Sequence, residues 1–266
     1  MNRAPIGIFD SGIGGLTVAR AIFEQLPHES TVYFGDTARV PYGPKSPETV
    51  RRYSLEILRW LLEQQVKAVV IACNTSTAHA LETLQSESPV PVIGVIEPGA
   101  RAAAGQGNGK PIGVIGTAGT IASNAYARAI QRVRGDARVE QKACPLFVPL
   151  VEEGWFEHHA AALIAEEYLA PLRAAGVGSL VLGCTHYPLL RPLLQRVMGE
   201  DVRLVDSGEE TARVVASVLR ERGREAPGGA AVEHRFVVSD DEARFRQVGA
   251  RFIGERLGRA EVVPLG

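Results

Sequence analysis

Two of the three cysteines in this chain stand at matching places, directly after short apolar runs. Cys73 follows AVVIA and Cys184 follows SLVLG. Each run predicts a buried strand, and each cysteine precedes a helix start, where backbone N–H groups and the helix dipole favour a thiolate over a thiol. One such cysteine alone is usually a small buried hydrophobe, but two in matched positions indicate thiols that exchange protons with one bound molecule.

A Gly-rich turn after the first apolar run adds two polar residues at a strand end. In FDSGIGG, Asp10 and Ser11 follow the run IGIF. Thr17 stands where a dinucleotide fingerprint beginning at Gly12 would need its third glycine, so we exclude a nucleotide loop. The carboxylate of Asp10 indicates a functional group at this strand end, whereas Ser11 fits either a ligand contact or a simple turn residue.

A polar loop, GDTARVPYGPKS at residues 35–46, is too long and too constrained for a simple connection. Tyr42 and Gly43 lie between two of its prolines. They either offer a hydroxyl and a backbone N–H to a ligand or form an ordinary surface turn, since functional residues and variable turns both concentrate in loops.

The residues beside the two cysteines extend the candidate site. Asn74, Thr75 and Thr185 are all good helix N-cap types, and a helix end that is capped can also bind a carboxylate. His186 either tunes Cys184 or serves as a structural hydrogen-bonding residue. These positions predict a site for a small molecule that carries a carboxylate.

The remaining candidate residues and the missing motifs limit the reactions that the protein can catalyse. Glu152 in LVEEGW is a weaker candidate from its spacing alone, and Cys144 lacks polar surroundings and is interpreted as structural. None of the four lysines ends a strand in a setting that supports a Schiff base to pyridoxal phosphate. The sequence has no HExxH, no Walker loop and no clustered Cys and His ligands. We therefore expect neither a cofactor nor a metal.

Composition excludes several broad classes of partner. The 266 residues include 29 basic and 30 acidic side chains, for a net charge of −1, which gives no footprint for nucleic acid or an anionic membrane. The first residues lack a signal-peptide core, and no apolar run approaches the roughly 18 residues of a spanning helix. We therefore expect a cytoplasmic protein that binds a small molecule. In that compartment three cysteines without a CxxC pair do not predict a disulfide framework.

Short β-branched runs alternate with helix-like segments along the whole chain. This alternation predicts parallel α/β structure, in which both faces of each sheet are covered. The expected strands are IGIF, TVYFG, AVVIA, IGVIG, SLVLG and VRLVD, with helices from about residue 16 and over 47–64. A connector at 223–231 precedes a final strand, helix and strand.

The chain also resembles itself. IGIFDSGIGGLTVAR at residue 6 and IGVIGTAGTIASNAYAR at residue 112 share a strand that ends in a small, hydroxyl-bearing turn. With the cysteine pair, this marks a repeat of about one hundred residues. Two like domains facing each other would bring the strand ends to one cleft, because open α/β sheets bind ligands at their carboxyl ends.

The motifs FDSGIGGLTV, YFGDTARVPYG, ACNTSTA and LGCTHYPLL resemble those of the cofactor-independent racemases of the aspartate/glutamate racemase superfamily. The resemblance covers most of residues 5–210. Related aspartate racemases typically have Glu after the second Cys-Thr, where this chain has His186, so glutamate is the implied substrate. The chain begins a few residues before its first expected strand, so we expect no N-terminal extension like that of members activated by a cell-wall precursor.

The resemblance implies that Cys73 and Cys184 are the acid/base pair, assisted by Asp10 and by His186 with Glu152, respectively. Asp10, Ser11, Tyr42, Gly43, Asn74, Thr75, Thr185 and His186 would surround the substrate. It implies an isomerase that supplies D-glutamate for peptidoglycan, and two α/β domains, 1–97 plus 208–266 and 98–207, with the site between them. Whether the chain forms a homodimer is left open.

Three other readings remain. A relative acting on aspartate or hydantoins, or a decarboxylase with one cysteine, would share the fold, but His186 and the second cysteine disfavour them. A non-catalytic amino-acid-binding protein is disfavoured by the paired thiols and the missing export signal. A thiol-disulfide redox pair would respond differently to alkylation, because only a substrate site should be protected by D-glutamate.

Overall fold

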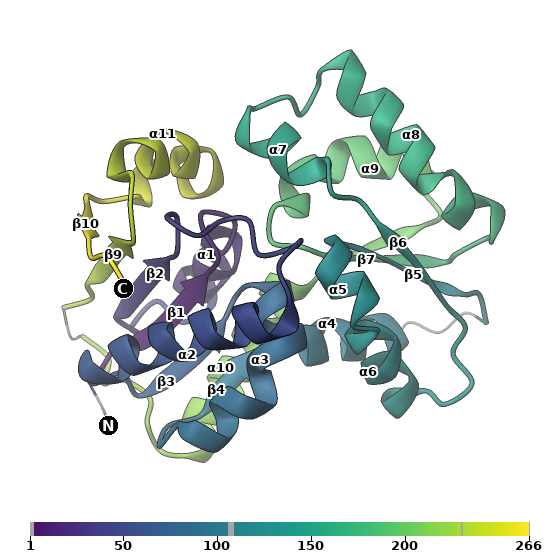
Figure 1. Ribbon diagram of the computed structural model, residues 1–266. Helices are drawn as coiled ribbons and strands as arrows, with labels where there is room; N and C mark the ends of the chain where they lie inside the picture. Colours follow the sequence, from purple (N-terminus) through teal and green to yellow (C-terminus); the bar gives the residue numbers. More distant parts are fainter. Residues whose placement is uncertain (1–2, 106–108, 230, 266) are drawn as a thin grey trace.

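The computed structural model describes residues 3–105, 109–229 and 231–265 and contains two parallel sheets (Figure 1). The first has the strand order β10-β9-β2-β1-β3-β4. Its strands are β1 (Ile6–Asp10), β2 (Thr31–Gly35), β3 (Ala68–Ile71), β4 (Val92–Gly94), β9 (His234–Val238) and β10 (Ala260–Val262). The second has the order β6-β5-β7-β8. It comprises β5 (Ile112–Gly116), β6 (Val139–Ala143), β7 (Ser179–Gly183) and β8 (Arg203–Asp206). Two parallel α/β units, as the sequence predicts, are therefore confirmed.

The internal repeat is visible in the strand order. The run β2-β1-β3-β4 of the first sheet recurs as β6-β5-β7-β8 in the second. The two similar Gly-rich segments accordingly form β1 and β5, and the two cysteines follow β3 and β7, the neighbours of those strands. The carboxyl ends that carry the candidate residues are thus equivalent in the two sheets.

Helices cover both faces of each sheet. The first sheet packs on one side against α1 (Leu16–Gln25), α10 (Ser207–Glu221) and α11 (Glu242–Ile253), and on the other against α2 (Pro47–Glu63) and α3 (Asn74–Glu87). The second packs against α7 (Phe147–Glu152), α8 (His159–Ala174) and α9 (Arg191–Met198), and on its other face against α4 (Ile96–Ala104) and α6 (Ala125–Val133). Short helices α5 (Ala118–Ala122), η1 (Tyr187–Leu190) and η2 (Gly254–Arg256) complete the fold.

One apolar cluster joins the two sheets. It runs without a break from Leu16 and Ile22 of α1 through Val215 of α10 to Leu182 and Leu193 beside the second sheet. Burial of apolar side chains is worth about 25 cal/mol per Å², so a shared cluster couples the two units energetically. The two α/β units therefore share part of their hydrophobic core.

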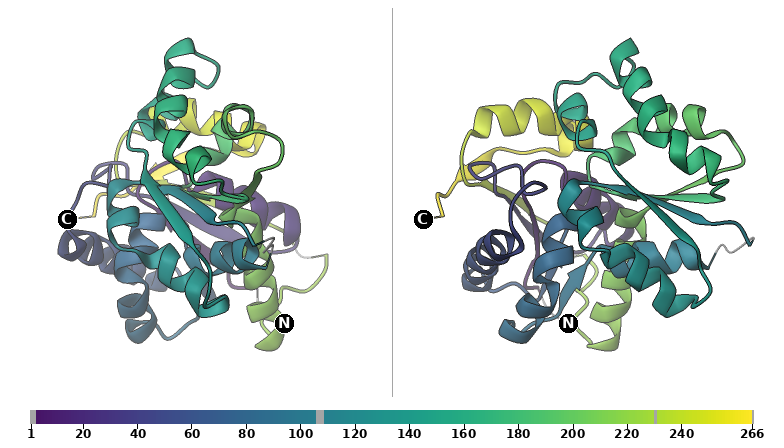
Figure 2. Two further views of the ribbon diagram at one scale, coloured as in Figure 1. Left: turned by 90° about the vertical axis from the view of Figure 1, so that its right-hand side faces the viewer. Right: turned by 45° about the vertical axis from the view of Figure 1, so that its right-hand side comes forward.

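The last segment of the chain returns to the first sheet. Strand β9 pairs in parallel with β2, and β10 pairs with β9. Figure 2 shows this C-terminal segment, in yellow, beside the N-terminal strands in purple. The predicted final strand, helix and strand are confirmed as β9, α11 and β10. Part of the predicted connector, residue 230, lies outside the described residues.

Local sequence accounts for the helix starts around the site. Ser46 caps α2 by accepting a hydrogen bond from the Thr49 N–H, and Pro47 fills the first helical position, which needs no donor. The polar loop before α2 is therefore fixed at its far end. This anchoring holds residues 36–45 near the carboxyl ends of β1 and β2.

Candidate active site

Cys73 lies between β3 and α3 and is itself the N-cap of the helix. Its Sγ accepts a hydrogen bond from the Ser76 N–H at 3.4 Å, and the residue is 5% exposed. Asn74 and Thr75, which the sequence marks as N-cap types, occupy the first turn of α3 instead. The sulfur thus lies at the N-terminus of α3, the end of a helix that binds anions.

Cys73 does not have the thiolate character that its position at a helix start predicts. Burial, reinforced by the charge of Asp10, raises the pKa of Cys73 to about 11, against hydrogen bonds from Ser76 and Ser11 that lower it. The prediction that this position favours a thiolate is therefore wrong, because desolvation outweighs the helix terminus. At neutral pH Cys73 is a thiol, which is a proton donor.

Cys184 follows β7 and faces a different environment. Its Sγ lies 3.9 Å from Nδ1 of His186, whose Nε2 lies 3.1 Å from Oε1 of Glu152. The next element is the short 3-10 helix η1, not the α-helix that the sequence suggests. Sulfur, imidazole and carboxylate form a chain of contacts, so the two predicted helpers of Cys184 do lie together with it.

The chain of contacts favours a charged imidazole. Burial lowers the pKa of His186, but hydrogen bonds with Cys184 and Glu152 outweigh it and raise the pKa to about 10. Burial alone would raise the pKa of Glu152, yet hydrogen bonds from His186 and Arg244 lower it overall. These shifts favour an imidazolium paired with a carboxylate, and the imidazole lies next to the Sγ of Cys184.

Asp10 links the first sheet to the second. Its Oδ2 accepts the N–H of Gly12 at 2.9 Å, and the Thr185 hydroxyl donates to its Oδ1 at 3.5 Å. Burial raises the pKa of Asp10, while the charge of His186 and the Gly12 N–H lower it. Thr17 Oγ1 also donates to the carbonyl of Thr185, at 3.0 Å. These bonds bring the carboxyl ends of β1 and β7 together.

The loop residues Tyr42 and Gly43 lie beside the first thiol. Tyr42 packs in one buried cluster with Cys73, and its hydroxyl donates to Asp36. The carbonyl of Gly43 accepts the N–H of Gly119 at 2.9 Å, which ties the loop to α5 of the second unit. The Tyr42 hydroxyl is thus engaged within the protein, and the loop itself closes against the opposite sheet.

Asn74 and Thr75 also contact the second unit. The Tyr126 hydroxyl donates to Asn74 Oδ1 at 2.7 Å, which turns the amide nitrogen Nδ2 toward a buried place where it has no partner among the described residues. Thr75 Oγ1 lies 2.9 Å from Thr117 Oγ1 and 3.3 Å from Thr120 Oγ1. A free amide donor and clustered hydroxyls are suited to a carboxylate.

Sequence reasoning missed several residues of this site. Asp36 is fully buried and binds Tyr42 and the Ser239 hydroxyl, so it fixes the loop against the C-terminal segment. The signal was present, because Asp36 follows β2 as Asp10 ends β1. The contacts that Arg244 and Phe252 make from α11 had no comparable signal, since they depend on how distant elements meet.

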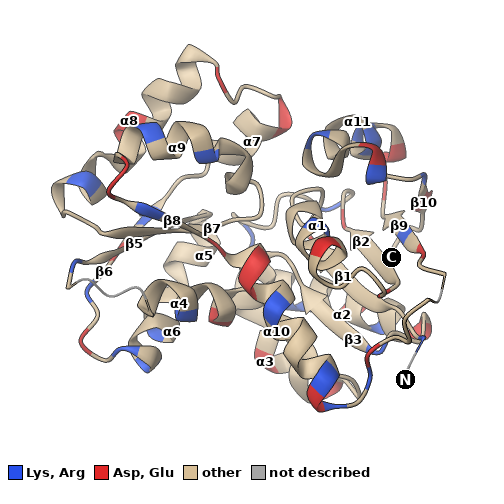
Figure 3. Ribbon diagram, turned by 180° about the vertical axis from the view of Figure 1, so that it is seen from behind, with Lys and Arg blue, Asp and Glu red and all other residues tan. Residues whose placement is uncertain are grey.

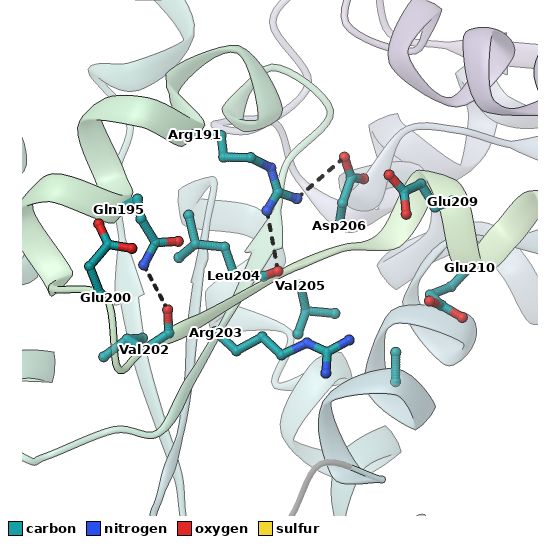
Figure 4. A pocket seen from close by; sticks show the side chains of 11 residues that line it. Arg191, Gln195, Glu200, Val202, Arg203, Leu204, Val205, Asp206, Glu209 and Glu210 are labelled. Atoms are coloured by element: carbon teal, nitrogen blue, oxygen red, sulfur yellow. Dashed lines mark hydrogen bonds and ion pairs between the residues drawn. The ribbon is translucent and has the colours of Figure 1, made fainter.

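Two hollows adjoin these residues and a third does not. One of about 400 Å³ is lined by Gly43, Thr117, Glu152 and apolar side chains. A smaller one of about 200 Å³ lies between Gly12, Glu152 and α11. The third, of about 550 Å³, lies beside the edge strand β8, and none of the predicted site residues lines it (Figure 4). Position next to the chemistry, and not volume, therefore identifies the candidate site.

Among the described residues no group of three or more His, Cys, Asp or Glu side chains is arranged to hold a metal ion. No helix in the described ranges has the length and apolar character needed to cross a membrane. Cys144 is buried with its Sγ 3.6 Å from the Lys142 carbonyl, in agreement with a structural role.

Fold and site together define a class: an α/β protein whose two parallel sheets each present a buried thiol, one beside a carboxylate and one beside an imidazolium. The profile of the family described as Asp/Glu/Hydantoin racemase matches residues 6–215. The chain belongs to this family.

Individual relatives are similar over the whole chain. It is 56% identical to a glutamate racemase of Geobacter metallireducens, over 98% of this chain and 96% of the relative. A crystal structure of a glutamate racemase isoform from Bacillus anthracis matches with a TM-score of 0.94 and 39% identity, covering 100% and 98% of the two chains. The Francisella tularensis glutamate racemase in complex with D-glutamate matches with a TM-score of 0.93 and 38% identity, covering 100% and 99%.

Proposed function

We propose that this protein is an isomerase that interconverts L-glutamate and D-glutamate. The observation that carries the proposal is the pair of buried thiols at equivalent strand ends, Cys73 after β3 and Cys184 after β7. Full-length similarity to proteins named glutamate racemase supports glutamate as the substrate. The product D-glutamate would serve peptidoglycan synthesis, and the proposed location of the protein is the cytoplasm.

The proposed mechanism uses one thiol on each face of Cα. A thiolate at Cys184, stabilised by the His186 imidazolium, removes the Cα proton of L-glutamate. The Cys73 thiol then delivers its proton to the opposite face of the carbanion, and the roles reverse for D-glutamate. No electron leaves or enters, and one proton is taken for each proton returned.

Acidity of the unactivated Cα–H is the main barrier, and the binding residues address it. Negative charge develops on the substrate carboxylate as the proton leaves, and fixed donors in a dry site stabilise that charge. The proposed donors are the N-terminus of α3, the free Nδ2 of Asn74 and the hydroxyl of Thr75. Thr185, whose hydroxyl donates to Asp10, is proposed to line the same pocket. Ser11, Tyr42 and Gly43 are proposed to complete the substrate pocket, which would lie between domains formed by 1–97 plus 208–266 and by 98–207.

Circular dichroism of L-glutamate incubated with the purified protein tests the function. The signal should decay to zero without any added cofactor, and D-glutamate should give the mirror-image decay. L-aspartate serves as the control and should be unaffected. A stable L-glutamate signal, or activity that appears only with an added cofactor, would disprove the proposal.

Isotope labelling distinguishes a two-base mechanism from a one-base mechanism. In heavy water, deuterium should enter Cα of the newly formed enantiomer, while the starting enantiomer stays protiated at early times, because the delivering thiol exchanges with solvent beforehand. Cys73→Ser and Cys184→Ser should each lose most racemisation and remain folded, since a hydroxyl is a far weaker acid. Equal early labelling of both enantiomers would instead indicate a single base.

A further inference from the structure

Helix α11 reaches across to the Cys184 side of the site. The helix belongs to the C-terminal segment and packs on the first sheet, where Phe245 contacts Tyr33 and Phe236. Glu152 ends α7, which packs on the second sheet. Figure 3 shows basic positions of α11 opposite the acidic end of α7. Contacts between these two helices therefore join the two units.

Two arginines of α11 hold Glu152 by different groups. Arg244 Nη2 lies 3.4 Å from the carboxylate oxygen Oε2, and Arg251 Nη1 donates to the backbone carbonyl of Glu152 at 2.5 Å. The other carboxylate oxygen, Oε1, faces His186. Both ends of the Glu152 residue are thus fixed from the opposite unit, and its second oxygen is left for the imidazole.

Two further features of the same helix agree with this arrangement. The Phe252 ring stands edge-on to the His186 ring, with centroids 5.7 Å apart and planes at 89°. Gly154 has a φ of +77°, and a Cβ there would lie 2.9 Å from the Arg251 guanidinium. The left-handed backbone at Gly154 favours glycine, and its missing side chain leaves the Arg251 guanidinium room to lie close to this turn.

We propose that Arg244 and Arg251 are positioning residues, which fix Glu152 and through it the orientation of His186 beside Cys184. They touch neither thiol and are not catalytic residues. The inference deepens the proposed function, on which its kinetic part rests. It assigns α11 a role in the Cys184 half of the reaction and none in the Cys73 half.

The chemical reason is that His186 must present Nδ1 to the sulfur in one orientation. A carboxylate that accepts a hydrogen bond from the far nitrogen fixes both the ring and its charge. A Glu152 side chain released from α11 would have other rotamers available, because it is a flexible chain at a helix end. The imidazolium would then spend less time beside Cys184, and the thiolate would lose its partner.

The test compares Arg244→Gln, the double variant with Arg251→Gln, and Arg244→Lys. Arg246→Gln is the matched control, because Arg246 lies on the same helix and its ion pair, with Glu242, is an exposed one. The first readout is the rate of iodoacetamide alkylation at Cys184 relative to Cys73, followed by peptide mass spectrometry. This ratio requires no racemase activity, and it corrects for any general opening of the site.

For Arg244→Gln the ratio should fall about two- to fivefold, the size expected when a half-exposed guanidinium loses its ion pair. The double variant should fall further, Arg244→Lys should restore most of the ratio, and Arg246→Gln should match the wild type. An unchanged ratio in the double variant, or equal slowing at both cysteines, would overturn the inference.

Kinetics supply the second readout. The primary isotope effect with Cα-deuterated L-glutamate should rise in the arginine variants, because proton removal by Cys184 becomes slower, whereas the effect with deuterated D-glutamate should change less. If the wild type does not racemise glutamate but the alkylation ratio falls, the proposed function is wrong and the positioning role stands. Normal isotope effects with an unchanged ratio would refute the role alone.

Discussion

Gly14 of the first unit packs tightly against Thr185 and His186 of the second, and adding one methyl group there tests the site geometry. A Cβ at Gly14 would lie 2.4 Å from His186 Nδ1 and 2.4 Å from Thr185 Oγ1. The first of these atoms faces Cys184, and the second donates to Asp10. The φ of Gly14 lies outside the left-handed region, so Ala is disfavoured by contact alone and not by backbone conformation.

The size of the displacement follows from these distances. Ordinary Cβ contacts begin at 3.4 Å, so the imidazole and the hydroxyl must each retreat by about 1 Å. A misplacement of about 1 Å in a catalytic group costs roughly 100-fold in rate. We therefore expect Gly14→Ala to lower kcat/KM about 100-fold in both directions and to lower the free energy of unfolding by about 1–3 kcal/mol, as overpacking does.

Gly12→Ala is the control in the same turn. Its Cβ would lie 3.3 Å from Cγ2 of Val40, a side chain that can shift, so racemisation and stability should stay near wild type. Initial rates by circular dichroism and urea unfolding curves would measure both variants. A folded Gly14→Ala protein with wild-type kcat/KM, or a Gly12→Ala protein that is equally impaired, would refute the geometry described for Thr185 and His186.

Three further predictions concern buried charges. Lys67→Met should lower the free energy of unfolding by about 3–5 kcal/mol in urea titrations, because it strands Glu29, whose side chain is 4% exposed, without its ion-pair partner. His186 has a folded-state pKa of about 10 against an ordinary 6.5, so its charged form stabilises the fold fully below about pH 6.5 and this contribution is lost as pH rises through about 10. Unfolding curves of His186→Asn should therefore vary less with pH across that interval than those of the wild type. Finally, Asp10→Asn and His186→Asn should slow kcat unequally in the two directions, in opposite senses, and matching losses would contradict one helper for each thiol.

The sequence predicted the backbone of the site well. TVYFG, IGVIG and SLVLG are strands over their predicted residues, and α2 begins at the expected Pro47. Such segments are predictable because their signals lie within the segment itself. These signals are an apolar run buried on both faces of a sheet, a Pro at the first helical position and a Ser cap. The sequence did not predict the order of the strands, but the recurrence of one order in the two sheets agrees with the internal repeat.

The surroundings of the two thiols were less predictable. A helix start after Cys73 suggested a thiolate, but its burial and the nearness of Asp10, 63 positions earlier in the chain, decide the opposite. The contact of Arg244 with Glu152 joins residues 92 positions apart. The pKa of Cys73 and the Arg244–Glu152 ion pair depend on desolvation and on the packing of distant elements, and no local pattern of residue types encodes either of these.

These two environments make the repeat symmetric in backbone and asymmetric in charge. A racemase of two bases needs one thiol protonated and the other ionised when its substrate arrives. Burial and the Asp10 carboxylate raise the pKa of Cys73, whereas Cys184 has the imidazole of His186 beside it. In the proposed mechanism, the form with its proton on Cys73 is the one that reacts with L-glutamate. One turnover leaves the opposite arrangement, so solvent exchange must restore the protons before the next L-glutamate reacts. Because the equilibrium constant between enantiomers is unity, kcat/KM must be equal in the two directions, and the charge asymmetry can appear only as kcat and KM values that differ together.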